Sequence, residues 1–99
     1  ALERYLVELV LASREPARYD AALARKIAWG ASPRGSIALD RCARARAWLN
    51  GRDYVTPEDV RAVAPDVLRH RVLPSYEAQA EGWDGGRLVE ELLRLVPLP

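Results

Sequence analysis

The stretch Gly30-Ala31-Ser32-Pro33-Arg34, with the helical pattern that follows it, decides how this sequence is interpreted. Ser32 is a residue type that caps helix N-termini, and Pro33 suits the first helical position, where its missing N–H costs nothing. The sequence therefore predicts a helix over about 33–50. Arg34 falls in its first turn, where the helix dipole disfavours a cation unless an anion such as phosphate lies between them. On spacing alone, a solvated surface arginine is the competing interpretation.

Three more helices are predicted from apolar residues that recur at helical spacing. Their approximate ranges are 2–14, 57–70 and 85–96. Thr56 is expected to cap the helix 57–70, and Pro65 is expected to break it, because proline removes a hydrogen bond and crowds the preceding turn. Ile27-Ala28-Trp29 and Arg71-Val72-Leu73 look extended and are predicted to pair. The fold class is therefore mainly all-α, a small bundle of four to five helices with one short two-strand ladder.

The helix 33–50 carries a narrow apolar stripe of mostly small residues, which favours close approach of a neighbouring helix. The stripe is assigned to Ala38, Cys42, Ala45 and Leu49, widened by Leu39 and Ala43. Cys42 is accordingly expected in the core rather than as a nucleophile. Asp40 and Arg44 are four residues apart and are expected to pair on the outer face. Residues 15–31 and 74–82 show no clear period, apart from a turn or two between Tyr19 and Lys26.

Composition limits the function more than it defines it. Ninety-nine residues make one small domain, and 15 basic against 14 acidic side chains leave a net charge of +1, without the footprint of a nucleic-acid binder. One cysteine and one histidine cannot form a Cys/His zinc site, so no metal site is expected. No phosphate-binding loop of the Gly-x-x-x-x-Gly-Lys-[Ser/Thr] type is present, so the chain is not expected to hydrolyse ATP alone. No membrane span or signal peptide is visible, and a reducing compartment is expected.

Three segments together resemble the C-terminal lid of MoxR-type AAA+ ATPases, in the family's order and at roughly its spacing. They are Gly30-Ala31-Ser32-Pro33-Arg34, Gly51-Arg52-Asp53-Tyr54-Val55-Thr56-Pro57-Glu58-Asp59-Val60 and Leu68-Arg69-His70-Arg71. The similarity runs from about residue 2 to residue 73, with a weaker family-like helix near 86–96. Gly35, after the arginine, departs from the helix former expected there and softens the helix start. Because the chain also lacks methionine, residues 1–99 are interpreted as a single lid domain excised from a longer ATPase.

The resemblance implies a role for Arg34 as the sensor 2 arginine, pointing toward the γ-phosphate of ATP bound on an upstream α/β domain. Gly30, Ala31, Ser32 and Pro33 would lie beside the nucleotide, with ATP or ADP and Mg²⁺ held only by the full-length protein. No nucleotide is expected to bind tightly to this domain alone. The implied partners are the upstream ATPase domain, neighbouring subunits of a hexameric ring and a von Willebrand factor A-type protein. The implied role is chaperone-like maturation of client proteins in the cytoplasm.

Other residues of these segments are predicted to be structural. Arg52 and Asp53 are expected to form an ion pair, Tyr54 and Val55 to pack against the helix 57–70, and His70 to lie at a helix C-terminus. The three tryptophans are expected in the core or at interfaces. Among them, Trp48 is placed with Arg41 and Arg44 on an outward arc that suits contact with a neighbouring subunit.

Two other functions compete with the lid. A helical adaptor that binds no nucleotide would make Arg34 dispensable. A DNA-binding module would use the basic run formed by Arg41, Arg44, Arg46 and Arg52. Glu58 and Asp59 argue against the DNA-binding module, because they begin the only candidate recognition helix and would repel phosphates.

Overall fold

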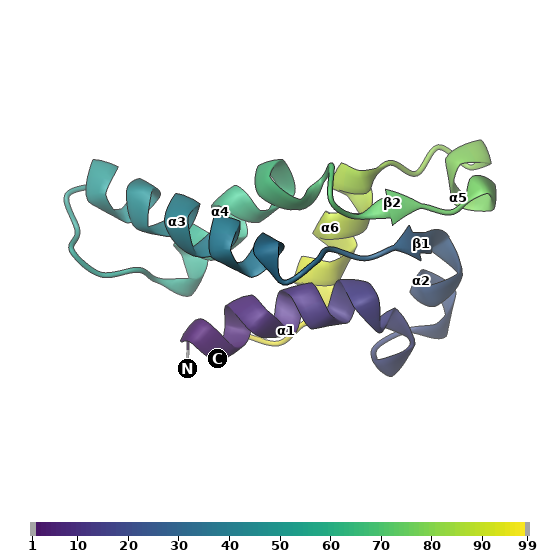
Figure 1. Cartoon of the computed structure of the whole chain (residues 1–99), viewed down its shortest axis with the longest axis horizontal. Helices are drawn as coiled ribbons and strands as arrows, with labels where there is room; N and C mark the ends of the chain where they lie inside the picture. The colour runs from purple at the N-terminus through teal and green to yellow at the C-terminus, as the bar shows by residue number, and fades with distance from the viewer. Residues whose placement is uncertain (1, 99) are drawn as a thin grey trace.

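The computed structural model describes residues 2–98, which form an elongated helical domain of 43 × 22 × 20 Å (Figure 1). Six α-helices, one 3₁₀ turn and two short strands are found among these residues. In chain order they are α1 (Leu2–Arg14), the 3₁₀ turn η1 (Pro16–Arg18), α2 (Ala21–Lys26), β1 (Ile27–Trp29), α3 (Arg34–Leu49), α4 (Pro57–Leu68), β2 (Leu73–Pro74), α5 (Tyr76–Ala80) and α6 (Gly85–Leu95).

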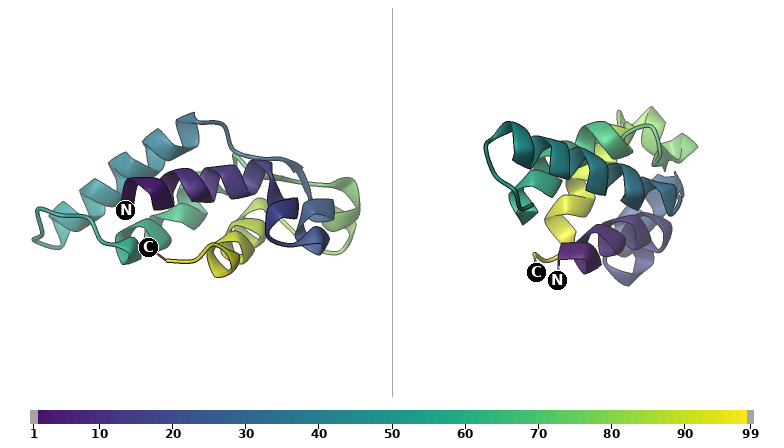
Figure 2. Two further views of the ribbon diagram at one scale, coloured as in Figure 1. Left: turned by 90° about the horizontal axis from the view of Figure 1, so that it is seen from below. Right: turned by 60° about the vertical axis from the view of Figure 1, so that its left-hand side comes forward.

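The core lies where α1, α3, α4 and α6 meet. α4 packs against both α3 and α6, and α6 crosses from α4 to α1, as Figure 2 shows from two further directions. Leucine and valine side chains with almost no exposed surface fill the centre. The largest are Leu9, Leu23, Leu39, Val60, Leu68, Val72, Leu88, Val89 and Leu92. The two ends of the described chain lie close together on one side of the domain (Figure 2).

The buried face of α3 differs from the predicted stripe. Its buried residues are Gly35, Leu39, Ala43 and Ala47. Leu39 and Ala43, which were expected to widen the stripe, are confirmed as buried, whereas Cys42, Ala45 and Leu49 of its assigned centre are exposed. The centre of the buried face is therefore displaced by about one residue, or about 100° around the helix. Cys42 is exposed rather than in the core. Alanines occur on both faces of α3, so they define its phase poorly, and Leu39 alone marks the side that packs against α4.

Pro65 does not break α4, contrary to the prediction. The helix runs continuously over Pro57–Leu68 and ends two residues before His70. Val60, Ala64 and Leu68 on one face of α4 have at most 1% of their surface exposed. Because this face is buried on both sides of Pro65, packing offsets the hydrogen bond that proline removes.

The predicted ladder exists, with shifted partners. Ile27 and Trp29 pair antiparallel with Pro74 and Leu73, so the second strand begins two residues later than predicted. Arg71 instead lies in a hydrogen-bonded turn, where its N–H donates to the Leu68 carbonyl (2.8 Å). The mainly helical fold class with one short ladder is confirmed.

Two short helices raise the number of helices above the predicted four to five. α2 is capped by Asp20, whose carboxylate accepts from the Ala22 N–H (2.7 Å), and α5 is capped by Ser75, whose hydroxyl accepts from the Ala78 N–H (3.2 Å). The turn or two expected between Tyr19 and Lys26 corresponds to α2. α5 was not predicted, because a helix of five residues is too short to show a hydrophobic period.

Candidate functional site

The segment 30–34 joins β1 to α3 and is attached to the end of α1. The Ala31 N–H donates to the Ser13 hydroxyl oxygen (2.9 Å), and that hydroxyl donates to the Val10 carbonyl (2.6 Å). A Cβ at Gly30 would lie 2.3 Å from the Ser13 carbonyl oxygen, so only glycine permits this approach. The side chain of Ala31 is fully buried. Gly30 and Ala31 thus pack against their own domain and fix the start of α3.

Arg34 is the first residue of α3, and its side chain is exposed. Pro33 precedes it in helical conformation (φ −55°, ψ −23°), as expected for a proline at a helix start. The predicted cap by Ser32 is wrong, since no side chain caps α3. The backbone oxygens of Ser32 and Pro33 instead accept from the N–H groups of Gly35 (2.8 Å) and Ser36 (3.1 Å).

Gly35 has a packing role that was not predicted from the sequence. A Cβ there would lie 3.3 Å from both the Ala31 Cβ and a Leu68 methyl carbon. The absence of a side chain therefore brings the first turn of α3 close to α4 and to the segment 30–34. Glycine has a low helix propensity, but at this position it allows the first turn of α3 to pack closely. The helix that begins with Arg34 is therefore held in place at its N-terminus.

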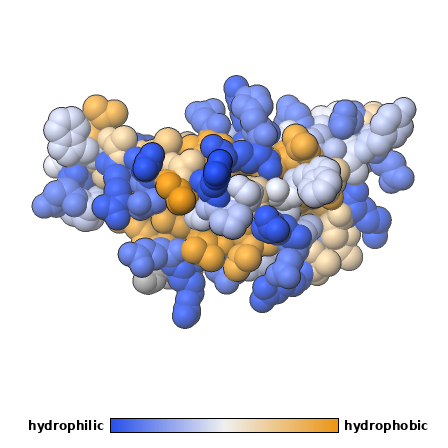
Figure 3. All heavy atoms as spheres, viewed as in Figure 1, coloured by the Kyte–Doolittle hydropathy of each residue, from blue (hydrophilic) through white to orange (hydrophobic). Residues whose placement is uncertain are grey.

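Three arginines gather at this end of α3. Arg34, Arg41 and Arg71 line one open hollow of about 420 Å³. Hydrophilic side chains stand over the face of the molecule drawn in Figure 3, with hydrophobic atoms between them. Among the described residues, none of the three guanidinium groups forms an ion pair. Arg71 was not a predicted site residue, since its segment was interpreted as structural.

A second arginine cluster surrounds Asp59, at the other end of α3. Asp59 has no exposed surface and accepts two hydrogen bonds from Arg52 (2.6 and 2.7 Å) and one from Arg46 (2.5 Å). Thr56 completes a capping box, in which its hydroxyl accepts from the Asp59 N–H and its own N–H donates to the carboxylate (2.8 Å). The Arg52 guanidinium, with help from Thr56 and Arg46, holds the pKa of Asp59 far below its usual range.

The structure corrects one predicted ion pair and confirms another. Arg52 pairs with Asp59 rather than with Asp53, which is exposed. The predicted pair of Asp40 with Arg44 is present, with Nε of Arg44 3.0 Å from the carboxylate. Sequence reasoning missed Asp59 as a partner because Arg46 lies thirteen residues away on another helix.

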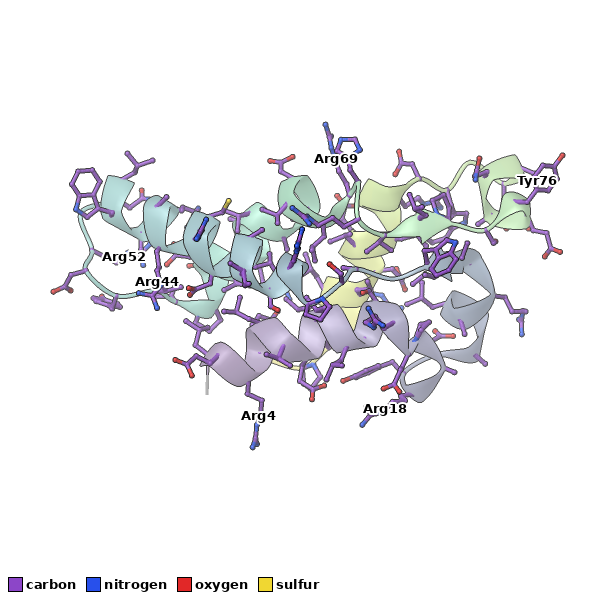
Figure 4. All side chains as sticks on the ribbon, viewed as in Figure 1. Arg4, Arg18, Arg44, Arg52, Arg69 and Tyr76 are labelled. Carbon is purple, nitrogen blue, oxygen red and sulfur yellow. The ribbon has the colours of Figure 1, made fainter. Side chains whose placement is uncertain are left out.

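Exposed aromatic residues mark a second hollow, of about 470 Å³, beside the loop 50–56. Trp48 and Tyr54 line it with Arg44 and Arg52, at the end of the domain where Figure 4 labels both arginines. Trp48 is 75% exposed, which fits the predicted outward position. Arg41, however, lines the hollow of Arg34 rather than that of Trp48, so the predicted outward arc is divided between two sites.

The remaining aromatic and histidine predictions have mixed outcomes. Trp29 is 73% exposed and is not a core residue. Trp83 is half-buried and packs between the Lys26 amino group (4.3 Å from the ring centroid) and the Arg87 guanidinium (3.9 Å). His70 lies in the exposed turn after α4, where its Nε2 is 3.3 Å from Nε of Arg69. Figure 4 shows Arg69 pointing away from the body of the domain.

Residues 2–98 contain neither a group of three or more His, Cys, Asp or Glu side chains that could hold a metal ion nor a helix long and apolar enough to cross a membrane. The arrangement that remains chemically distinctive is the hollow of three unpaired arginines. Guanidinium groups that are not neutralised by carboxylates suit an anionic ligand, above all phosphate.

Comparison with known proteins identifies the class of domain. Residues 19–92 match the AAA lid domain family, so the chain belongs to that family. Within it, the lid is of the MoxR type. The chain is 41% identical over its whole length to the chaperone MoxR1 of Mycobacterium tuberculosis and 43% identical to the MoxR protein of Paracoccus denitrificans.

A solved crystal structure is also similar to this chain, in both fold and sequence. The crystal structure of a protein from Cytophaga hutchinsonii described as an ATPase superposes with a TM-score of 0.92 at 47% identity and covers 99% of this chain. A shorter match, 50% identical over 58 residues, is to the magnesium-chelatase subunit ChlI of Nicotiana tabacum. The chain spans 26% and 31% of the two MoxR relatives and 30% of the solved chain, so the similarity concerns this domain alone.

Proposed function

We propose that this domain is the lid of a longer AAA+ ATPase, here called the parent ATPase, and that Arg34 is its sensor 2 arginine. In this proposal Arg34 contacts the γ-phosphate of ATP bound with Mg²⁺ on an upstream α/β domain of the parent ATPase. One observation carries the proposal. Arg34 begins α3 as an exposed arginine without an ion pair among the described residues, beside two further arginines. A cation in that position is unfavourable until an anion is present.

The attachment of Arg34 to α1 suggests how the contact is coupled to movement. A guanidinium at the γ-phosphate stabilises charge that develops during phosphoryl transfer, and it loses its partner when the phosphate leaves. The segment 30–34 is held to α1 through Ser13, so a shift at Arg34 is transmitted to the rest of the domain. Hydrolysis would then change the position of the lid as a rigid body. Ser32 and Pro33, both exposed, would lie nearest the nucleotide with Arg34.

The proposal extends to the assembled machine. We infer that the parent ATPase forms hexameric rings in the cytoplasm, contacts neighbouring subunits partly through this domain, and remodels client proteins with a von Willebrand factor A-type partner. The Mycobacterium tuberculosis relative is a chaperone, which supports this role. Nucleic acid is not the proposed ligand, since the net charge of this domain is only +1.

ATP turnover of the parent ATPase tests the proposal. Arg34→Ala is expected to lower the rate at saturating ATP by at least about tenfold, or roughly 1.4 kcal/mol of transition-state stabilisation. Arg25→Ala is the matched control, because Arg25 is an exposed arginine of α2 and has no ion pair among the described residues. Circular dichroism checks that both variants fold. Equal turnover in the wild type and the folded Arg34→Ala variant would contradict the sensor 2 role.

A nucleotide-independent adaptor is the second candidate, and the exposed Trp48 and Tyr54 favour it. An adaptor would leave ATP turnover indifferent to Arg34. It would instead lose its partner when Trp48 is replaced by alanine. The two candidates therefore predict opposite results for the same pair of variants.

A further inference from the structure

The hollow at the start of α3 contains two arginines besides Arg34, the proposed sensor 2 residue. Its lining includes Arg34, Arg41 and Arg71 and no acidic residue. This local excess contrasts with the whole chain, whose net charge is only +1. Like charges held together raise the electrostatic potential of a hollow and attract an anion into it. An anionic ligand in this hollow would therefore be favourable.

Two of the arginines come from a single helix face. Arg34 and Arg41 are seven residues apart on α3, which places them on the same side of the helix about two turns apart. Ile37 and Ala38, in the intervening turn, also line the hollow. A ligand that contacts both arginines must therefore be extended or carry more than one charged group.

Arg71 reaches the hollow from a different part of the chain, on a well-fixed turn. The N–H groups of Arg71 and Val72 both donate to the Leu68 carbonyl (2.8 and 3.0 Å), and Val72 is fully buried. α6 packs tightly on this turn, since a Cβ at Gly85 would lie 1.8 Å from the Arg69 carbonyl oxygen. Arg71 is therefore presented by a fixed backbone at a fixed distance from α3, as a binding residue requires.

We propose that Arg71 is a second phosphate-binding residue of the nucleotide site and contacts the same polyphosphate as Arg34, with Arg41 as a weaker third contact. This inference rests on the proposed function, because the ligand is ATP held by the upstream domain. Arginine suits this task because its planar fork can donate two hydrogen bonds to one phosphate. Two guanidinium groups from separate elements grip a triphosphate from two sides and orient it.

Binding of a non-hydrolysable ATP analogue to the parent ATPase tests the inference. Arg71→Ala is expected to raise the dissociation constant at least about fivefold, Arg71→Lys to raise it less, and Arg41→Ala to raise it about twofold. ADP binding is measured beside it, because ADP lacks the γ-phosphate, so loss of a contact there weakens ATP binding and leaves ADP binding unchanged. Arg25→Ala serves again as the control, and the thermal midpoint of each variant shows that it folds.

The outcomes separate this inference from the proposed function. If Arg34→Ala weakens binding of the analogue or slows turnover while Arg71→Ala stays within twofold of the wild type in binding, the inference about Arg71 is wrong and the role of Arg34 stands. If neither variant has an effect, both proposals are wrong. If Arg71→Ala weakens ATP and ADP equally and Arg71→Lys restores nothing, Arg71 is structural and the inference is again overturned. Selective weakening of ATP with partial rescue by lysine supports it.

Discussion

The two arginine clusters of this domain lie near opposite ends of α3 and differ in one respect. Around Asp59, two guanidinium groups converge on a carboxylate that has no exposed surface. In the hollow of Arg34, three guanidinium groups line a space without any acidic residue. Arginine thus stabilises the fold in the Asp59 cluster and is available to bind a ligand in the hollow of Arg34. The charge that the fold itself neutralises is structural, and the charge that it leaves unmatched is available for binding.

The difference follows from the cost of burying charge. A carboxylate removed from water is tolerated only when hydrogen-bond donors replace the lost hydration, as Arg46, Arg52 and Thr56 do for Asp59. The exposed arginines of the other cluster remain hydrated and need no internal partner. Removing a member of the first cluster should therefore damage the fold, whereas removing a member of the second should damage only the function.

The largest effect is expected from Asp59→Ala. Loss of the carboxylate leaves two arginines unpaired and removes half of the capping box, which together cost about 3 kcal/mol of unfolding free energy. Urea denaturation of the 99-residue chain measures the loss. Asp53→Ala is the matched control, because Asp53 is exposed and its replacement should change stability by less than about 0.5 kcal/mol. Equal losses from the two variants would show that the buried Asp59 supports the fold no more than an exposed carboxylate does.

A somewhat smaller loss is expected from Gly85→Ala, which tests how firmly the turn that carries Arg71 is held. The new Cβ would meet the Arg69 carbonyl oxygen, so α6 or the turn must shift, at a cost of about 2 kcal/mol. Gly86→Ala is the control, since the nearest atom to a Cβ there is 3.5 Å away and alanine favours the helix by up to about 1 kcal/mol. Opposite changes in thermal midpoint are expected. A Gly85→Ala variant as stable as the wild type would show that the turn is free to move.

Acid provides the third test. Because the pKa of Asp59 is lower in the folded protein than in the unfolded chain, its contribution to stability is complete above the unfolded value of 3.8 and is lost as the pH falls below it. Between pH 6 and pH 3 this group should contribute a loss of about 1 kcal/mol. The unfolding free energy from urea denaturation should therefore fall by about 1 kcal/mol less over this pH range in Asp59→Asn, which cannot titrate. An unchanged slope would mean that Asp59 does not carry the acid sensitivity.

The sequence was sufficient for features that lie within a few residues of one another. The helix start at Thr56, the pair of Asp40 with Arg44 and the position of Arg34 at the start of α3 were all predicted from local spacing. The two clusters were not predicted. Arg46 and Asp59 meet across two helices, and Arg71 approaches Arg34 only because α4 folds back along α3.

Other errors arose from weak local signals. The phase of α3 could not be fixed from alanines, which tolerate either face, and the effect of Pro65 depended on packing that local propensity does not describe. One signal could have found the buried cluster. Asp59 is the third residue after a threonine cap, a position from which its carboxylate must turn back toward the loop that carries Arg52.

The smallest change in stability is expected from replacing Arg34 or Arg71, and it best distinguishes the ligand-binding cluster from the structural one. Arg34→Ala and Arg71→Ala remove cations that form no ion pair within residues 2–98, so the stability of the 99-residue chain should change by less than about 0.5 kcal/mol. Arg34→Ala should even stabilise slightly, because a cation in the first turn opposes the helix dipole. Arg52→Ala, by contrast, removes two hydrogen bonds to a buried carboxylate and should cost about 1.5 kcal/mol. The thermal midpoints of these three variants compare arginine with arginine, so each variant loses one positive charge, although only Arg34 lies in a helix. The opposite result is that Arg34→Ala or Arg71→Ala destabilises the chain as much as Arg52→Ala does. That result would show that the fold needs these charges, and it would contradict the proposal that the hollow binds phosphate.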